Sequence, residues 1–409
     1  MDIAADLKPA RAKLLASIGE IHYKKGMPRG LYIHIPFCKT RCHYCNFISF
    51  GETTPEFRER FFKALFEEVR EAGKKYGQLF FDTLYLGGGT PSLLNAQEMT
   101  GLFGEVRKNF EISQDAEITC EWNPGDGEEE KFSVLRALGV NRLSLGVQSF
   151  QDGLLSQLGR RHTVHDTLRT LEKIQKAGIG NISFDLMLRI PGQKLADFQE
   201  SLERCVACGA AQVSLYDLEV HKATVFGGLR EKGALALPDE EEHAGMYQAA
   251  CEGLVRAGYE HYEISNFARP GFASRHNLIY WHNQEYLGLG PGAFSYLGGI
   301  RSQFAGEGIR YLEKCEAGDW RNDQEDVLSE AERETETFAM GLRLAEGVKL
   351  RDFPGIYPGL RERVETLLQK GLLELADEEL RLTAWGRFLS EDIFGFLLQK
   401  DRGSEACFL

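Results

Sequence analysis

The sequence lacks the markers of a membrane-spanning or secreted protein. It contains no apolar run of roughly 18 residues, so no transmembrane helix is expected. The first 29 residues carry Asp2, Asp6 and Glu20 among their lysines and have no long apolar block. They therefore predict neither a signal peptide nor a typical transit peptide. We expect a cytoplasmic protein, and peripheral contact with a membrane stays an open alternative.

An excess of positive charge is also absent. The chain has 48 lysines and arginines against 61 aspartates and glutamates, which gives a net charge of -13. Proteins whose main role is nucleic-acid binding need a basic surface, so we expect no nucleic-acid partner. A composition that is 43% hydrophobic and 27% charged is typical of an ordinary globular protein.

The sequence does not read as a disulfide framework, because its nine cysteines are scattered over 409 residues and suit reduced thiols. Three of them form a C-x3-C-x2-C run at Cys38, Cys42 and Cys45. Full cysteine ligation of a four-iron, four-sulfur cluster takes four thiolates, so three leave one iron open. We predict that this iron chelates the amino and carboxylate groups of S-adenosylmethionine, whose one-electron cleavage would release a 5'-deoxyadenosyl radical. The alternative is a zinc site with His43, in the same loop, as the fourth ligand.

Short apolar runs alternate with amphipathic stretches from Leu31 onward. This alternation predicts an α/β fold of parallel β/α units that close into a partial six-stranded barrel. The expected strands are Leu31–Ile35, Thr83–Leu86, Glu117–Glu121, Arg142–Val147, Ile182–Leu188 and Gln212–Leu218. The expected helices between them are Glu56–Ala72, Ala96–Asn109, Glu129–Leu138, Val164–Ala177 and Leu195–Cys208.

Four segments are expected along the chain. Residues 1–29 predict a helical extension, and residues 30–258 predict the barrel. Residues 259–329 are rich in aromatics, histidine and glycine and predict a further extension. Residues 330–409 combine a helix, a short β-hairpin and a final helix, which is typical of a small winged-helix-like domain.

Polar side chains and glycines stand where the expected strands end. Gly87, Gly88, Gly89 and Thr90 follow the second strand, and we expect this loop to meet the methionine end of the cofactor. Phosphate is the competing ligand, but no P-loop lysine follows. Glu121 and Gln148 end the third and fourth strands and offer hydrogen-bonding groups to ribose hydroxyls.

Two charged residues complete the expected site. Arg160 is suited to bidentate capture of a carboxylate. Asp185 stands within an otherwise apolar strand, where a charge is costly unless it has a partner.

Several long runs resemble the radical S-adenosylmethionine enzymes of the oxygen-independent coproporphyrinogen III oxidase family. The resemblance extends from residue 31 to about residue 398. The matching runs are residues 32–38, 87–92, 145–150, 262–267, 276–281, 286–290 and 341–344. In the decarboxylating oxidases a fourth cysteine stands two positions after the third, where this chain has Phe47. The heme chaperone branch of the family, called HemW, also lacks that cysteine and carries an H-N-x-x-Y-W motif.

The resemblance implies roles for particular residues. Cys38, Cys42 and Cys45 would ligate the cluster. The cofactor contacts would be Tyr32, Tyr44, Gly88, Gly89, Thr90, Glu121, Gln148, Arg160 and Asp185. The H-N-x-x-Y-W motif corresponds to His276, Asn277, Tyr280 and Trp281, which become the heme candidates. His276 is an expected axial ligand, with tight structural packing as the alternative, and the neighbouring aromatics would pack against the macrocycle.

Two functions follow from this resemblance, with a third kept open. The first is a heme chaperone that binds heme and delivers it to acceptor hemoproteins, membrane respiratory proteins among them. The second is oxidative decarboxylation of coproporphyrinogen III, which the absence of a fourth cysteine disfavours. A methyltransferase of the same superfamily is the third. All three imply an electron donor if S-adenosylmethionine is cleaved rather than only bound.

Overall fold

A computed structural model describes residues 27–76, 79–127, 129–356 and 358–398. The predicted helical extension over residues 1–29 therefore falls outside the described residues except for its last three, which lead directly into the first strand. Within the described part of the chain, no helix is both long enough and apolar enough to cross a bilayer.

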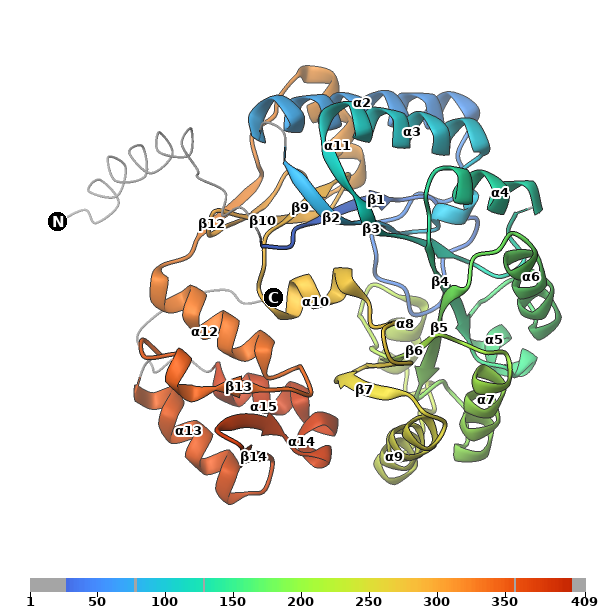
Figure 1. The fold of residues 1–409 in the computed structure, drawn as a ribbon. Helices are drawn as coiled ribbons and strands as arrows, with labels where there is room; N and C mark the ends of the chain where they lie inside the picture. Colours follow the sequence, from blue (N-terminus) through green and yellow to red (C-terminus); the bar gives the residue numbers. More distant parts are fainter. Residues whose placement is uncertain (1–26, 77–78, 128, 357, 399–409) are drawn as a thin grey trace.

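Six parallel strands form the centre of the molecule and follow one another in sequence order (Figure 1). They are β1 (Gly30–Ile35), β2 (Phe80–Gly88), β3 (Glu111–Trp122), β4 (Arg142–Gln148), β5 (Asn181–Leu188) and β6 (Gln212–Asp217). The helices between them are α2 (Pro55–Tyr76), α3 (Ala96–Asn109), α4 (Glu129–Ala137), α5 (Asp152–Gln157), α6 (Val164–Lys176) and α7 (Leu195–Ala207), with the 3-10 turn η2 (Pro91–Leu93). The predicted parallel β/α fold is confirmed. The barrel is partial because β1 and β6 do not pair with each other.

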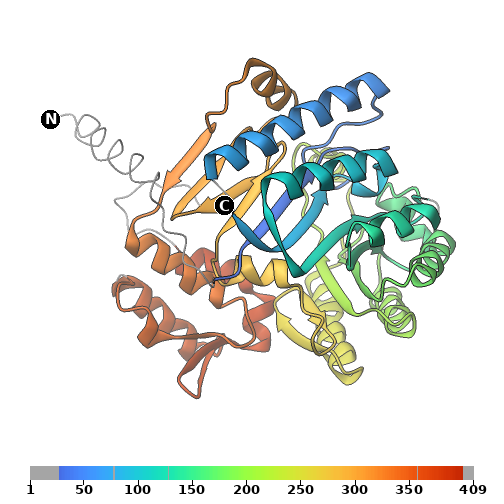
Figure 2. The same cartoon turned by 45° about the horizontal axis from the view of Figure 1, so that its top comes forward.

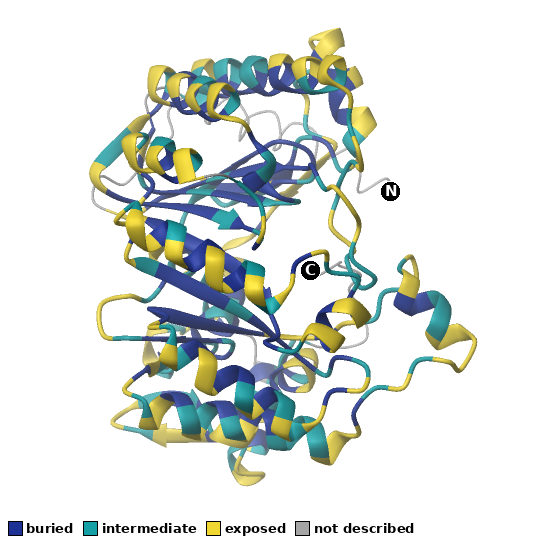
Figure 3. Cartoon of the chain, turned by 90° about the vertical axis from the view of Figure 1, so that its right-hand side faces the viewer, coloured by how far each residue is buried: buried dark blue, intermediate teal, exposed yellow. Residues whose placement is uncertain are grey.

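Local sequence explains where these elements begin. Asn95 caps α3 and Thr163 caps α6, and in each case the acidic residue three positions later, Glu98 or Asp166, bonds back to the capping residue's backbone. β4 is buried along its whole length, as expected of a central parallel strand. The helices turn their buried faces toward the strands and their exposed faces outward (Figure 3).

The segment after β6 extends the same sheet on both edges, which sequence periodicity did not predict. β8 (Asn266–Ala268) joins β6 antiparallel and β9 (Tyr286–Leu289) joins β1 parallel, so the sheet reaches 12 strands. The outer strands are β7 (Glu260–Glu263), β10 (Phe294–Leu297), β11 (Ile300–Gln303) and β12 (Gln324–Val327). The accompanying helices are α8 (Val225–Glu231), α9 (Glu240–Arg256), α10 (Arg275–Trp281) and α11 (Gly308–Ala317).

The C-terminal part has its own hydrophobic core and lies beside the barrel in both ribbon views (Figures 1 and 2). Its helices are α12 (Glu330–Gly341), η3 (Leu350–Asp352), α13 (Pro358–Gln369), α14 (Ala384–Phe388) and α15 (Ser390–Leu397). The predicted hairpin is present as β14 (Leu373–Ala376) and β15 (Glu379–Leu382), and β13 (Val348–Lys349) adds a third strand. The division of the chain into four segments stays a prediction.

Candidate functional site

The three clustered cysteines lie in the loop between β1 and α2. The backbone N–H of Cys38 donates to the carbonyl of Phe50 over 2.9 Å, and the N–H of His43 donates to the carbonyl of Leu158 over 3.0 Å. The three thiols are partly exposed, and none of them forms a disulfide. Burial raises the pKa of the Cys38 and Cys45 thiols, so an isolated thiolate is disfavoured there until a metal compensates for its charge.

The alternative zinc ligand, His43, is engaged away from the thiols. Its Nδ1 lies 2.8 Å from the carbonyl oxygen of Gln157, and its ring packs edge-on against Phe226. Among the described residues, no group of three or more His, Cys, Asp or Glu side chains could hold a metal ion. A four-iron cluster makes a different demand, because each thiolate binds a separate iron and the sulfur atoms need not converge on one point.

A cavity of about 690 Å³ opens between this loop and the carboxyl ends of the parallel strands. Eleven of the twelve residues expected at the cluster and the cofactor line it: Cys38, Cys42, Tyr44, Cys45, Gly88, Gly89, Thr90, Glu121, Gln148, Arg160 and Asp185. The exception is Tyr32, which lines a neighbouring cavity. The carboxyl ends of parallel strands are where this class of fold places its chemistry.

The glycine run fits closely between β1 and the cysteine loop. The N–H of Gly89 donates to the carbonyl of Ile35 over 2.9 Å. A Cβ at Gly89 would lie 2.8 Å from the carbonyl oxygens of Ile35 and Phe37. Both oxygens belong to the backbone, so they could not move aside as a side chain can. Gly88 has a φ of 109°, a conformation that favours glycine. Glycine is therefore required for the loop to approach the cluster site.

Two partly buried carboxyl groups line the cavity. Glu121 accepts hydrogen bonds from the hydroxyl of Tyr85 and from the N–H of Gly88, each over 3.0 Å. Asp185 accepts from the hydroxyl of Ser144 over 3.0 Å. Burial raises the pKa of both carboxyl groups, that of Asp185 to about 7. Tyr85 and Ser144 were not predicted, although both follow the alternation of inward-pointing residues along their strands.

Gln148 and Arg160 supply polar atoms that the protein leaves unpaired. Gln148 has a φ of 63°, a left-handed conformation uncommon for this residue type. Arg160 donates to Asn123 over 3.1 Å and to the Gly146 carbonyl over 3.2 Å, and it lies 3.8 Å from the Cys42 sulfur. Among the described residues, Gln148 Oε1 and Arg160 Nε are buried and have no hydrogen-bond partner. Buried polar groups of this kind need partners, so the site fits a polar ligand.

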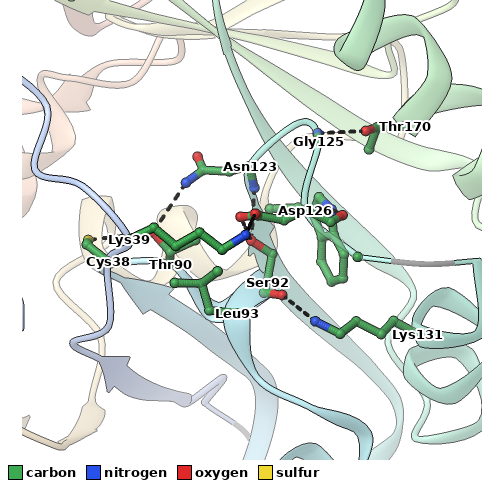
Figure 4. A network of polar contacts seen from close by, with 12 residues as sticks. Cys38, Lys39, Thr90, Ser92, Leu93, Asn123, Gly125, Asp126, Lys131 and Thr170 are labelled. Carbon is green, nitrogen blue, oxygen red and sulfur yellow. Dashed lines mark hydrogen bonds and ion pairs between the residues drawn. The ribbon is translucent and has the colours of Figure 1, made fainter. Parts of the chain in front are cut away.

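A polar network that the sequence did not predict supports the thiol side of the cavity (Figure 4). Thr90 Oγ1 lies 3.6 Å from the Cys38 sulfur and accepts a hydrogen bond from the Asn123 amide over 3.2 Å. Asp126 accepts from Lys39 and from Ser92, each over 2.9 Å. Because Lys39 follows the first cysteine directly, this ion pair ties the cysteine loop to the end of β3. Asn123 follows β3 directly and Asp126 stands three residues further on, and this place after a strand end is the one signal that could have found them.

The H-N-x-x-Y-W motif lies in α10, and none of its residues lines the cluster cavity. His276 is 2% exposed, with Nδ1 2.7 Å from Thr83 Oγ1 and Nε2 2.8 Å from the Tyr280 hydroxyl. The Arg343 guanidinium lies 4.2 Å from the centre of the Trp281 ring. Both ring nitrogens of His276 therefore have hydrogen-bond partners within the protein, and its role as an axial heme ligand stays a prediction. Tyr280 is the one heme candidate that lines a cavity.

Comparison with known proteins places this geometry in a family. Residues 32–205 match the Radical SAM superfamily, and residues 328–389 match the HemN C-terminal domain. The chain is 37% identical over 381 residues to the heme chaperone HemW of Bacillus subtilis. The aligned residues cover 90% of this chain and 99% of that protein. The chain belongs to the HemW family. The heme chaperone HemW of Lactococcus lactis is 35% identical over 379 residues, and the alignment covers 91% of this chain and 98% of that protein.

One solved structure shows the same fold as this HemW family member. The radical SAM coproporphyrinogen III oxidase HemN of Escherichia coli superimposes with a TM-score of 0.81 at 22% identity, over 94% of this chain and 93% of its own. Membership of the radical SAM superfamily implies a [4Fe-4S] cluster and S-adenosylmethionine as cofactors. Three clustered thiols, a glycine cradle and two unpaired polar atoms fit that pair of ligands.

Proposed function

We propose that this protein binds heme and delivers it to acceptor hemoproteins, membrane respiratory proteins among them. One observation carries the proposal: proteins named heme chaperone HemW match about nine-tenths of the chain at 35–37% identity. Both relatives are matched over nearly their whole length, so the likeness is not confined to the shared radical SAM segment.

The proposal assigns the cluster cavity to the cofactors. Cys38, Cys42 and Cys45 would bind three irons of the cluster. Around the nucleotide, the backbone of Gly88 and Gly89 would meet the amino end, and the Arg160 guanidinium would meet the carboxylate. The unpaired oxygen of Gln148 supports a role in accepting a ribose hydroxyl hydrogen. When bound, the two cofactors supply one-electron reduction at the sulfonium, which calls for an electron donor.

Phe47 supports the chaperone over the decarboxylase. It lines the cluster cavity at the position where the oxidases carry a fourth cysteine, and its side chain is 65% exposed. A phenyl ring offers neither a thiol ligand nor a hydrogen-bonding group. Such a residue suits contact with a flat apolar molecule better than participation in an oxidative step.

The test is a set of parallel assays on one anaerobically reconstituted preparation. Heme binding is followed by absorbance, coproporphyrinogen III consumption by porphyrin analysis, and methyl transfer by mass spectrometry. The proposal expects saturable heme binding at a fixed ratio, without decarboxylation or methylation. Formation of protoporphyrinogen would establish the oxidase instead, and a methylated product would establish a methyltransferase. Absence of saturable heme binding would overturn the proposal.

A further inference from the structure

Arg142, the first residue of β4, places a positive charge inside the barrel. Its side chain is 2% exposed, and Ser144, two residues further along the strand, lines the cluster cavity. Alternate residues of a strand point to the same side, so Arg142 also points into the barrel, one layer further from the carboxyl ends of the strands. The guanidinium therefore lies beneath the cluster cavity rather than in its wall.

This charge has no direct partner in the described part of the chain. Arg142 Nε is buried without a hydrogen-bond partner, and no carboxylate of the described residues forms an ion pair with the guanidinium. Its neighbours in register, Thr119 on β3 and Asn181 on β5, each carry a buried oxygen that likewise has no partner among the described residues. Burying a charge in this way is costly, so nearby opposite charges must offset the cost.

The opposite charges come from the two carboxyl groups that line the cavity. Glu121 and Asp185 stand on β3 and β5, the strands on either side of β4. Arg142 acts electrostatically on both, and in each case it opposes the rise in carboxyl pKa that burial causes. Their hydrogen bonds come from neutral donors, the hydroxyls of Tyr85 and Ser144 and one backbone N–H. A positive charge is therefore what favours their ionised form.

Two positively charged groups stand among the titratable groups that act on these carboxyl groups. The titratable groups come from every neighbouring element and are Tyr32, Tyr44, Tyr85, Cys120, Arg142, Arg160, Cys205, Tyr216 and Tyr280. Burial raises the pKa of each of these phenols and thiols, so they are neutral near pH 7. Arg160 already donates to Asn123 and to the Gly146 carbonyl. Arg142 is the positive charge that has no other engagement.

We propose that Arg142 is a positioning residue of the cofactor site, because its charge beneath Glu121 and Asp185 keeps both carboxyl groups ionised as hydrogen-bond acceptors. An ionised carboxylate accepts at both oxygens, as a pair of ribose hydroxyls requires, whereas a protonated one must itself donate. Two carboxylates outnumber one guanidinium, so the site still attracts a sulfonium cation. The inference rests on the proposed assignment of S-adenosylmethionine to this cavity and is independent of heme binding.

The test titrates S-adenosylmethionine calorimetrically into reconstituted wild type, Arg142→Gln and Arg142→Lys, at pH values from about 6.5 to about 9. Glutamine keeps hydrogen-bonding groups without the charge, whereas lysine keeps the charge. Each titration is repeated in a buffer of different ionisation enthalpy, which counts the protons released on binding. The amino group of the ligand titrates alike in all three proteins, so each variant is compared with wild type at the same pH. Thermal melting checks folding.

We expect the affinity of wild type to level off above about pH 7, where Asp185 is ionised. Arg142→Gln should bind about tenfold more weakly than wild type near pH 7, release more protons on binding and approach wild type at alkaline pH. Arg142→Lys should follow the wild-type profile. A loss in Arg142→Gln that is equal at every pH, without extra proton release, would show a merely structural role and overturn the proposal. Unchanged affinity would overturn it too.

A second measurement needs no change at Arg142. Infrared spectra of wild type at about pH 8, compared with those of Glu121→Gln and Asp185→Asn, identify the band of each protonated carboxyl group. We expect both groups to be largely ionised, and a strong protonated band from either would overturn the proposal. Failure of wild type to bind S-adenosylmethionine would refute the cofactor assignment on which the proposal rests, whereas the proposed heme function is tested separately by heme titration.

Discussion

Nδ1 of His276 lies 2.7 Å from the hydroxyl oxygen of Thr83, inside the barrel and below the cluster cavity. This contact joins α10 to β2, the strand that ends in the glycine run. The His276 ring also packs against Tyr85, whose hydroxyl donates to Glu121. Burial lowers the pKa of His276 to about 3, so its ring is neutral at physiological pH. The histidine of the motif thus supports the floor of the cofactor site.

Replacing His276 with alanine should therefore lower stability more than heme affinity. We expect the free energy of unfolding to fall by about 2–4 kcal/mol, because the change leaves a cavity and removes two buried hydrogen bonds. Urea denaturation and a heme titration of the folded protein measure the two effects. His282→Ala, at a half-exposed neighbouring position, is the control. Loss of heme binding without loss of stability would instead identify His276 as the iron ligand.

Gly89 should not tolerate even a methyl group. Gly89→Ala would place Cβ 2.8 Å from two backbone carbonyl oxygens, so the cysteine loop must move. Overpacking of this kind costs about 1–3 kcal/mol, and we expect S-adenosylmethionine affinity to fall at least about tenfold. Calorimetric titration of the reconstituted protein with S-adenosylmethionine measures this affinity.

The control for Gly89 lies on α3. A Cβ at Gly104 meets nothing within 4 Å, and the residue lies within the helix. Gly104→Ala should keep cofactor affinity and raise stability by about 0.5–1 kcal/mol. Equal cofactor affinity in both variants would show that the close approach of Gly89 is unimportant.

The sequence predicted the number and order of the six parallel strands because each contains a buried apolar run. β3 begins six residues before the expected Glu117, because its first residues are exposed and show no apolar run. The expected helix Ala96–Asn109 has the same bounds in the structure, where Asn95 and Glu98 form its capping box. The strands beyond residue 259 were missed because β7 to β12 have only three or four residues each. Runs that short show no readable period, and their pairing depends on the edges that β1 and β6 leave open.

The candidate site was predicted unevenly for a similar reason. Residues at strand ends, such as Glu121 and Gln148, converge because parallel strands end on the same side. His276 was expected to face heme, but no sequence pattern says which side of a seven-residue helix is buried. Of its two hydrogen-bond partners, Tyr280 lies one turn further along α10, whereas Thr83 becomes visible only when α10 is packed against β2.

Glu68 on α2 should make stability depend on pH. Its carboxyl group is buried and accepts from the Tyr311 hydroxyl over 2.7 Å and from the Gly290 N–H over 2.8 Å. Burial raises its pKa from 4.5 to about 7. The folded state therefore holds this proton more tightly than the unfolded state, and the stability it contributes is present below pH 4.5 and lost as pH rises through 7.

Glu68→Gln should remove that dependence, because the amide keeps an acceptor oxygen and does not ionise. We expect the variant to become progressively more stable than wild type as pH rises from about 4.5 to 7, with no further gain above that range. Denaturant titrations across this range measure the difference. Glu59→Gln, at an exposed position on the same helix, should follow the wild-type profile. A constant difference at all pH values would mean that Glu68 does not titrate there.

Each cysteine of the triad should be required for the cluster. Cys38→Ser, Cys42→Ser and Cys45→Ser should each lose the visible absorption of the cluster and most of the bound iron and sulfide. The reason is that two thiolates cannot hold three irons. Cys208→Ser, at a partly exposed position outside the triad, should retain both. Full iron and sulfide in any triad variant would show that another residue ligates the cluster.

The proposed delivery of heme is measured by its transfer to an acceptor protein. Heme-loaded protein, with its cluster reconstituted, is mixed anaerobically with an apo-hemoprotein, the two are separated, and heme is measured in each fraction. We expect heme to leave this protein and to appear in the acceptor faster than free heme enters the acceptor at an equal concentration and the same ionic strength. Heme that stays bound to this protein, or that enters the acceptor no faster than free heme, would show that the protein does not deliver heme.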